Sequence, residues 1–204
     1  MIYRCVKNIM PTRFDPKIHH RRSNRLKGYD YSQAGAYFVT IVSQGRMSFF
    51  GAIRDGEMIF NDAGRMVHAI WESMPERFPQ IELGAFVVMP NHFHAIVIIN
   101  DSAAFGAGLV PAPRATTRVA PTSSIAPTLG RIIGTFKSIT TQEYIAGVDN
   151  LGWTQFHKRL WQRNYYEHII RNDHEMDAIL RYIEANPASW GADEENSGDN
   201  LITR

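Results

Sequence analysis

The strongest constraint on the fold is a pair of apolar runs, residues 81–89 and 92–99, with only Pro90 and Asn91 between them. Both runs are rich in Val, Ile and Phe, which favour β-strands. Proline followed by asparagine is typical of a turn at the end of a strand. The sequence therefore predicts two adjacent strands, and the second strand begins directly after this turn.

The predicted second strand carries two histidines, His92 and His94. Alternate residues of a strand share a face, so both imidazoles would point the same way and could hold one metal ion. The same pattern also fits two partly buried histidines that bond to neighbouring carbonyl groups. By ligand chemistry alone, two imidazoles suit zinc or another transition metal better than magnesium, which prefers oxygen ligands.

Strand and helix patterns alternate along the rest of the chain. The predicted elements are a strand at residues 37–43, a hairpin within 49–60 around Asp55 and Gly56, a helix from Asn61 or Asp62 to about Ser73, an amphipathic helix over 129–144, a short closing strand at 156–161, and a last helix that begins at Asn172 or Asp173 and ends before Pro187. This order predicts an α+β fold: a ferredoxin-like (RRM-like) antiparallel sheet with helices on one face, plus an added hairpin and a C-terminal helix. That fold hosts RNA binders and enzymes alike, so it does not decide the function.

The last predicted helix presents two polar residues, Tyr182 and Asn186, which are four positions apart. At this spacing they lie on one side of the helix, one turn from each other. A tyrosine and an amide would therefore be presented together. The alternatives are a core-edge aromatic residue at Tyr182 and an asparagine that merely ends the helix before a proline.

The chain is predicted to form a single domain over residues 31–190. Its 204 residues, 44% of them hydrophobic, are enough for one core. Residues 101–127 are rich in Ala, Pro, Ser and Thr without periodicity, which predicts a flexible loop inside the domain. No apolar run is long enough to span a bilayer, and the first residues lack the apolar region of a signal peptide. The single cysteine, Cys5, excludes an internal disulfide and fits a reducing compartment.

Charge is distributed unevenly along the chain. Residues 1–30 carry eight Lys or Arg and two Asp or Glu, whereas residues 172–204 carry two and eight. The basic N-terminal arm, residues 1–30, is a candidate for contacting phosphates, because backbone charge dominates nucleic-acid affinity. Its candidate residues are Arg21, Arg22, Arg25 and Lys27. A solvated terminus is the alternative. No chemistry is assigned to the acidic tail, residues 191–204.

Four blocks of the sequence, in order, resemble one known family. Residues 89–94 read Met-Pro-Asn-His-Phe-His, and residues 21–31 with 35–40, 161–171 and 182–187 resemble the segments that accompany this motif. The family is that of the single-tyrosine transposases with a His-hydrophobe-His (HUH) motif, which includes the tyrosine transposases associated with repetitive extragenic palindromes. Four matches in order are more specific than any one of them.

The resemblance implies a site and a reaction. Tyr182 matches the nucleophile, and His92, His94 and Asn186 match the metal ligands, for Mg²⁺ or Mn²⁺. The implied reaction is cleavage and rejoining of single-stranded or hairpin DNA through a 5′-phosphotyrosine intermediate, as in DNA transposition or the processing of palindromic repeats. The resemblance also implies a bacterial cytoplasmic location at the nucleoid and allows a homodimer. Further candidate phosphate contacts are Arg131, Lys137 and Arg163, beside Arg159.

Rival readings of the sequence remain. Tyr165 and Tyr166 are the other candidate nucleophiles, although neither has a polar residue one turn later. A non-catalytic ferredoxin-like module could bind nucleic acid through basic and aromatic residues. A zinc hydrolase would need an acidic base, for which the last helix offers Glu175 or Glu184.

Overall fold

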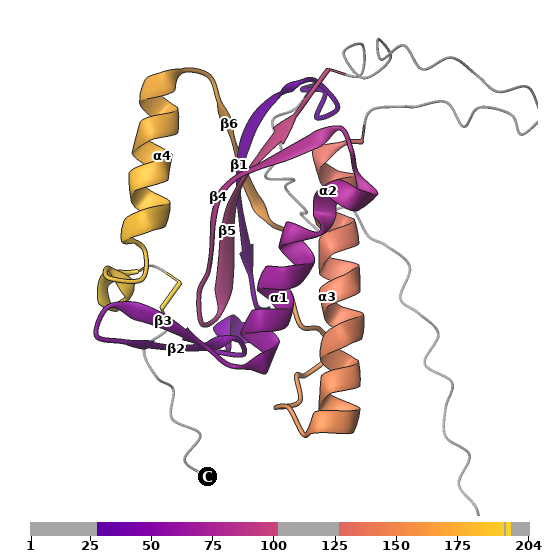
Figure 1. The fold of residues 1–204 in the computed structure, drawn as a ribbon, viewed down its shortest axis with the longest axis vertical. Helices are drawn as coiled ribbons and strands as arrows, with labels where there is room; N and C mark the ends of the chain where they lie inside the picture. Colours follow the sequence, from indigo (N-terminus) through magenta and orange to yellow (C-terminus); the bar gives the residue numbers. More distant parts are fainter. Residues whose placement is uncertain (1–27, 102–126, 194, 197–204) are drawn as a thin grey trace, which may run out of the picture.

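The computed structural model describes residues 28–101, 127–193, 195 and 196 of the 204-residue chain (Figure 1). Several predicted features lie outside the described residues: nearly all of the basic N-terminal arm, all but the first and last residue of the predicted loop 101–127, and part of the acidic tail. The four candidate phosphate contacts of the arm, Arg21, Arg22, Arg25 and Lys27, are among them. None of the helices in the described part of the chain has the length and apolar character that a membrane span requires.

The main sheet is antiparallel and has four strands in the order β4-β5-β1-β6 within the described residues. Its strands are β1 Gly35–Val42, β4 Ile81–Val88, β5 His92–Ile99 and β6 Tyr166–Ile170. The central strands β1 and β5 pair along their whole length. Their register places Thr40 opposite His94 and Val42 opposite His92, so the end of β1 lies beside the start of β5.

Helices cover both faces of this sheet. Helices α1, α2 and α3 lie on one side, whereas α4 lies on the other (Figure 1). Their bounds are α1 Asp62–Glu72, α2 Met74–Arg77, α3 Leu129–Leu151 and α4 Asp173–Ala185. The side chains of Asn61, Thr128 and Asn172 accept a backbone N–H at the start of α1, α3 and α4, which stabilises those helix ends. The mixed α/β architecture with an antiparallel sheet is thus as predicted.

The core lies between the sheet and the α1–α3 layer. Phe93 of β5, Trp71 of α1 and Phe136 of α3 are fully buried, and their ring centroids lie 4.8 to 5.1 Å from one another. Burial of each such side chain stabilises the fold by about 1.5–3 kcal/mol. Because strand residues alternate, packing Phe93 into this core turns His92 and His94 toward the face that α4 covers.

The predicted hairpin is confirmed as β2 (Gly51–Arg54) and β3 (Glu57–Phe60), which form a separate two-stranded sheet. Its turn residues, Asp55 and Gly56, have φ angles of 52° and 79°. Two positive φ angles in succession are what a type I′ turn requires.

The predicted closing strand at residues 156–161 is wrong. The structure forms only an isolated bridge between Ser43 and Trp161 there, and the fourth strand is β6, which pairs with β1. The apolar signal came from Leu160 and Trp161, which are buried as core side chains and not as members of a ladder. Helix α3 also continues to Leu151, beyond the predicted end near Tyr144, and stops at Gly152 with φ 69°.

Candidate functional site

The two histidines of β5 are held in one orientation by polar neighbours. His92 and His94 are 0% and 2% exposed, and their ring centroids lie 4.5 Å apart. The Nδ1 atom of His92 lies 2.9 Å from Oδ1 of Asn91, and Nδ1 of His94 lies 2.8 Å from Oγ1 of Thr40. Each ring is therefore fixed through Nδ1, which leaves its Nε2 atom directed into the site.

The amide of Asn91 determines the tautomer of His92. Its Nδ2 donates to the carbonyl oxygens of Arg46 and Glu195, so the atom that faces His92 is the acceptor Oδ1. Nδ1 of His92 must therefore donate. Burial lowers the pKa of His92, against the opposing effect of the nearby Asp193 carboxylate, and favours the neutral ring. A neutral ring with its proton on Nδ1 presents a lone pair at Nε2, the form that binds a metal.

Burial also lowers the pKa of His94 well below its usual value, and the neighbouring His92 adds to this effect. Both imidazoles are accordingly neutral near pH 7. This is the protonation state in which two adjacent rings can bind one cation without repelling it or each other.

Helix α4 brings Tyr182 and Asn186 to the same place, as their spacing predicts. The hydroxyl of Tyr182 lies 3.2 Å from Nε2 of His94, and its ring makes edge contacts with His94 and Phe38. Tyr182 remains 45% exposed, whereas Asn186 is 2% exposed. Tyr182 is therefore held by the buried site and is still accessible to a large substrate.

A carboxylate that the sequence analysis missed completes this cluster. After α4 the chain turns through a short 3-10 helix, Trp190–Ala192, and returns Asp193 to the site. The Asp193 side chain is 5% exposed, its Oδ2 lies 4.0 Å from Nε2 of His92, and it accepts a hydrogen bond of 3.1 Å from Nδ2 of Asn186. Metal-ligand atoms of His92, His94 and Asp193 all lie within 4.8 Å of one another.

The cluster contains two hydrogen-bond acceptors that no group in the described residues donates to. Nε2 of His92 and Oδ1 of Asn186 are buried and have no hydrogen-bond partner among the described residues. Beside them lies the nearly buried carboxylate of Asp193. Two orphaned lone pairs and a buried negative charge are costly unless a cation satisfies them. As metal ligands, the two imidazole nitrogens, the Asn186 amide oxygen and the Asp193 carboxylate therefore fit a divalent metal ion.

The acidic residues near the site are not the ones that the sequence indicated. Glu175 lies at the start of α4, where it accepts from the backbone N–H of Arg171 and contacts His168, about 10 Å along the helix from Tyr182 at 1.5 Å per residue. Glu184 is exposed. The carboxylates at the site belong instead to Asp193 and Glu195, and Glu195 pairs with Arg46 at 2.6 Å.

A hollow of about 600 Å³ opens beside this cluster. Tyr182 borders it, together with Tyr166, which is 54% exposed on β6. Its other polar lining residues include Thr40, Arg46, His94, Asn186, Asp193 and Glu195. Tyr166 is thus the rival tyrosine that shares the space around the site, while Tyr165 packs partly buried against the core.

The three candidate phosphate contacts within the described residues have different surroundings. The Lys137 ammonium donates to the backbone carbonyls of Gln162, Arg163 and Asn164, so it holds that segment in place. Burial, together with the charge of Arg159, lowers the pKa of Lys137 to about 8.

The other two candidates lie on different faces of the molecule. Arg131 packs over the ring of Phe78, on the side of the sheet that carries α1 to α3. Arg163 is exposed and borders a hollow beside Thr40 and Tyr166. Of the three, only Arg163 combines exposure with a position next to the site.

Comparison with known proteins identifies a relative in sequence. The chain is 39% identical to an uncharacterized protein of Haemophilus influenzae over 188 residues, which cover 91% of this chain and 98% of that protein. The chain belongs to the same family as this Haemophilus influenzae protein. No family model matches the chain.

Two solved structures are similar to this one at low identity. One is a REP-associated tyrosine transposase bound to a REP hairpin, with 20% identity, a TM-score of 0.47, and coverage of 82% of this chain and 74% of that chain. The other is a proposed transposase from Deinococcus radiodurans, with 16% identity, a TM-score of 0.40, and coverage of 78% of this chain and 95% of that chain.

Proposed function

We propose that this protein is a metal-dependent tyrosine nuclease and strand transferase that acts on single-stranded or hairpin DNA. The observation that carries the proposal is the approach of the Tyr182 hydroxyl to within 3.2 Å of His94 in a buried cluster of neutral histidines, an amide and a carboxylate. The resemblance of residues 89–94 and 182–187 to the HUH transposases supports the same assignment.

The fold class that we assign is ferredoxin-like. The strand order β4-β5-β1-β6, with α1 between β1 and β4 and α3 between β5 and β6, supports it. The hairpin β2–β3 and helix α4 are then additions to that core, and α4 supplies the proposed nucleophile.

The residues that would hold the metal are His92, His94, Asn186 and Asp193. A Mg²⁺ or Mn²⁺ ion bound there supplies charge that polarises the scissile phosphate and stabilises the departing 3′ oxygen. Two nitrogen donors suit Mn²⁺ better than Mg²⁺, and the Asp193 carboxylate adds the oxygen that both ions favour.

Tyr182 is proposed to make the covalent bond. Its phenolic oxygen attacks phosphorus, the bond from phosphorus to the 3′ oxygen breaks, the phenol proton passes to water and the 3′ oxygen takes a proton from water. The products are a 5′-phosphotyrosyl bond and a free 3′-OH. Because the phosphodiester energy is conserved, a 3′-OH from another end can reverse the step. Contacts of Tyr182 with Phe38 and His94 orient the ring for this attack.

Incubation with end-labelled hairpin DNA from the sequences that flank the gene tests this proposal, in Mn²⁺ and on a denaturing protein gel. The proposal predicts a labelled protein band that is lost in Tyr182→Phe and on addition of a chelator. Tyr166→Phe is the matched control, since it removes a second exposed hydroxyl from the same hollow and should keep the band. Tight DNA binding without any labelled band would favour a non-catalytic nucleic-acid-binding module.

A further inference from the structure

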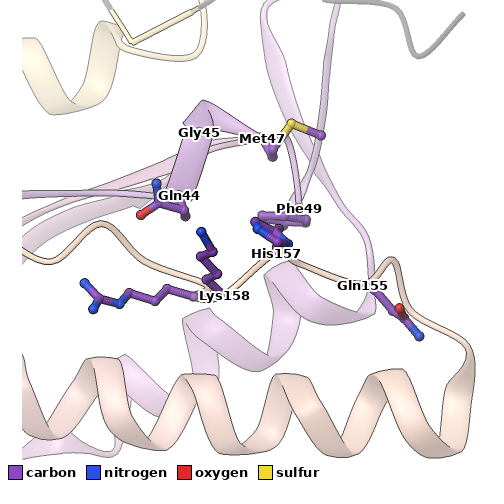
Figure 2. Close-up of a pocket in the computed structure, with 8 residues that line it drawn as sticks. Gln44, Gly45, Met47, Phe49, Gln155, His157 and Lys158 are labelled. Atoms are coloured by element: carbon purple, nitrogen blue, oxygen red, sulfur yellow. The ribbon is translucent and has the colours of Figure 1, made fainter. Parts of the chain in front are cut away.

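A second hollow, of about 860 Å³, shares no lining residue with the hollow beside Tyr182. Figure 2 shows the residues that line it. One wall comes from the segment after β1, which includes the short 3-10 helix Gln44–Arg46, and the other from the loop after α3. In Figure 2 the side chain of Lys158 extends toward Gln44. We call this hollow the 44/158 pocket; its lining residues are Gln44, Gly45, Met47, Phe49, Gln155, His157, Lys158 and Arg159.

The 44/158 pocket is positively charged. Lys158 and Arg159 are exposed, and within the described part of the chain no ion pair joins either of them to a carboxylate. Burial is the main cause of the lowered pKa of Lys137, and the positive charge of Arg159 adds to it. Uncompensated cations that lie close together attract an anion, and phosphate is the anion that Arg and Lys bind well.

The remaining lining residues suit a nucleotide base. Gln44, toward which Lys158 extends, offers an amide donor and acceptor that can bond to the polar edge of a base. Met47, 40% exposed, and His157 offer an apolar and an aromatic surface, on which the face of a base can lie. The pocket therefore combines the chemistry of a phosphate site with that of a base site.

The loop that carries the cations is held in an unusual backbone conformation. Lys158 has a φ of 65°, and the N–H of Arg159 donates to the carbonyl of His157 at 2.7 Å, so Lys158 is at the centre of a three-residue turn. A lysine rarely adopts this conformation, and such strain is concentrated at functional positions. The N–H of Gln44 donates to the carbonyl of the buried Leu160 at 2.7 Å, which fixes the two walls relative to each other.

The 44/158 pocket is connected to the candidate active site. Gln44 also borders a smaller hollow of about 300 Å³, which Arg163, Thr40 and Tyr166 line. Thr40 and Tyr166 border in turn the hollow beside Tyr182. Because extended backbone advances about 3.3 Å per residue, Thr40 to Gln44 spans about 13 Å, the length of about four stacked nucleotides at ~3.4 Å each.

We propose that the 44/158 pocket is a subsite for one unpaired nucleotide of the DNA strand that Tyr182 cleaves, about four nucleotides from the scissile phosphate. Lys158 and Arg159 bind its phosphate, and Gln44 contacts the edge of its base. The inference rests on the proposed function, because the position of the subsite is counted from the phosphate that Tyr182 is proposed to attack.

Fluorescence anisotropy with two DNA hairpins tests the subsite. One hairpin carries an unpaired extension that reaches at least four nucleotides to each side of the cleavage position, and the other is blunt. For the double variant Lys158→Gly, Arg159→Gln, we expect at least a tenfold loss of affinity for the extended hairpin and no loss for the blunt one. The salt dependence should also become less steep by about 1.4 in log–log slope, the value for two lost phosphate contacts on a single strand.

The control variant is Arg77→Gln, an exposed arginine of α2 that is not part of the pocket. It should leave the affinity and the salt slope for the extended hairpin unchanged. Glycine at position 158 relieves the backbone, so an unchanged or raised Tm is expected and excludes unfolding as the cause. Arg159→Gln alone keeps the native turn, and its salt-dependence slope should change by about half as much as that of the double variant.

The two proposals fail in different ways. If the labelled Tyr182 band forms and the double variant binds the extended hairpin as tightly as the unchanged protein does, the subsite is refuted and the proposed function stands. If no band forms on any DNA but the double variant still loses affinity and slope, the subsite stands as a nucleic-acid site and the cleavage chemistry is refuted.

Discussion

Replacing Asp193 by asparagine tests whether the carboxylate that returns after α4 is a metal ligand. The Asp193 side chain is 5% exposed and its Oδ2 lies 4.0 Å from Nε2 of His92, so a metal ion bound between them would be its main counter-charge. Without metal, the buried Asp193 carboxylate destabilises the fold. We therefore expect the free energy of unfolding of metal-free Asp193→Asn to lie within about 1 kcal/mol of that of the unchanged protein.

The magnitude follows from linkage between binding and folding. At free Mn²⁺ about 100 times Kd, binding stabilises the native state by about 2.7 kcal/mol, which for a chain of this size is roughly 5–10 °C in Tm. If loss of this ligand weakens Mn²⁺ binding about 100-fold, the same concentration stabilises Asp193→Asn by only about 0.4 kcal/mol, or roughly 1 °C.

The assay is thermal unfolding with and without Mn²⁺, followed by circular dichroism. Glu195→Gln is the matched control, because it removes the next described carboxylate of the same segment, which pairs with Arg46, and should keep most of the Mn²⁺ shift. A full Mn²⁺ shift in Asp193→Asn would refute the assignment of this carboxylate to the metal site.

Three further predictions address the surroundings of the site and the fold. Asn91→Leu removes the acceptor that orients His92, so Mn²⁺ affinity measured by calorimetry should fall about 10- to 100-fold; unchanged affinity would contradict that role. Lys137 has a folded pKa of about 8 against 10.5 for the free side chain, so between these pH values the unfolded state binds more protons and the free energy of unfolding should rise with pH. In denaturant titrations, the free energy of unfolding of Lys137→Met should not show this rise. An equal rise in both proteins would contradict the explanation. In α3, Gly147→Ala adds a Cβ that overlaps the ring of Trp153, whereas at Gly134 nothing lies within 4 Å, so Gly147→Ala should cost about 1–3 kcal/mol and Gly134→Ala should stabilise by about 1 kcal/mol; equal Tm shifts would contradict this packing.

Local patterns predicted most of the fold. The β-branched runs and the Pro90–Asn91 turn predicted β4 and β5, and the Asp55–Gly56 pair predicted the hairpin. These predictions succeeded because the signals depend on neighbouring residues only. The false strand at 156–161 failed because burial of Leu160 and Trp161 is a tertiary contact, and an apolar residue in a core-filling loop looks the same in sequence as one in a strand.

Some residues of the candidate site could likewise be predicted from local patterns, and others could not. His92 with His94 and Tyr182 with Asn186 could be grouped by strand and helix periodicity, and the structure brings the two pairs together. Asp193 could not be grouped by any period, because its position depends on the turn through Trp190–Ala192 that follows Pro187. The run of acidic residues that begins at Asp193 was visible in the sequence. That one of them belongs to the site could not be predicted, because this depends on where the chain turns.

The most direct test of the central claim is to locate the covalent bond on the protein. After reaction with hairpin DNA in Mn²⁺, nuclease trimming and trypsin digestion, mass spectrometry identifies the peptide that retains a nucleotide. Trypsin cleaves after Arg181 and Arg163, so Tyr182 falls in the peptide 182–204, whereas Tyr165 and Tyr166 fall in the peptide 164–171. We predict the nucleotide on peptide 182–204, as a 5′-phosphotyrosine; a nucleotide on peptide 164–171, or none on either, would contradict the account.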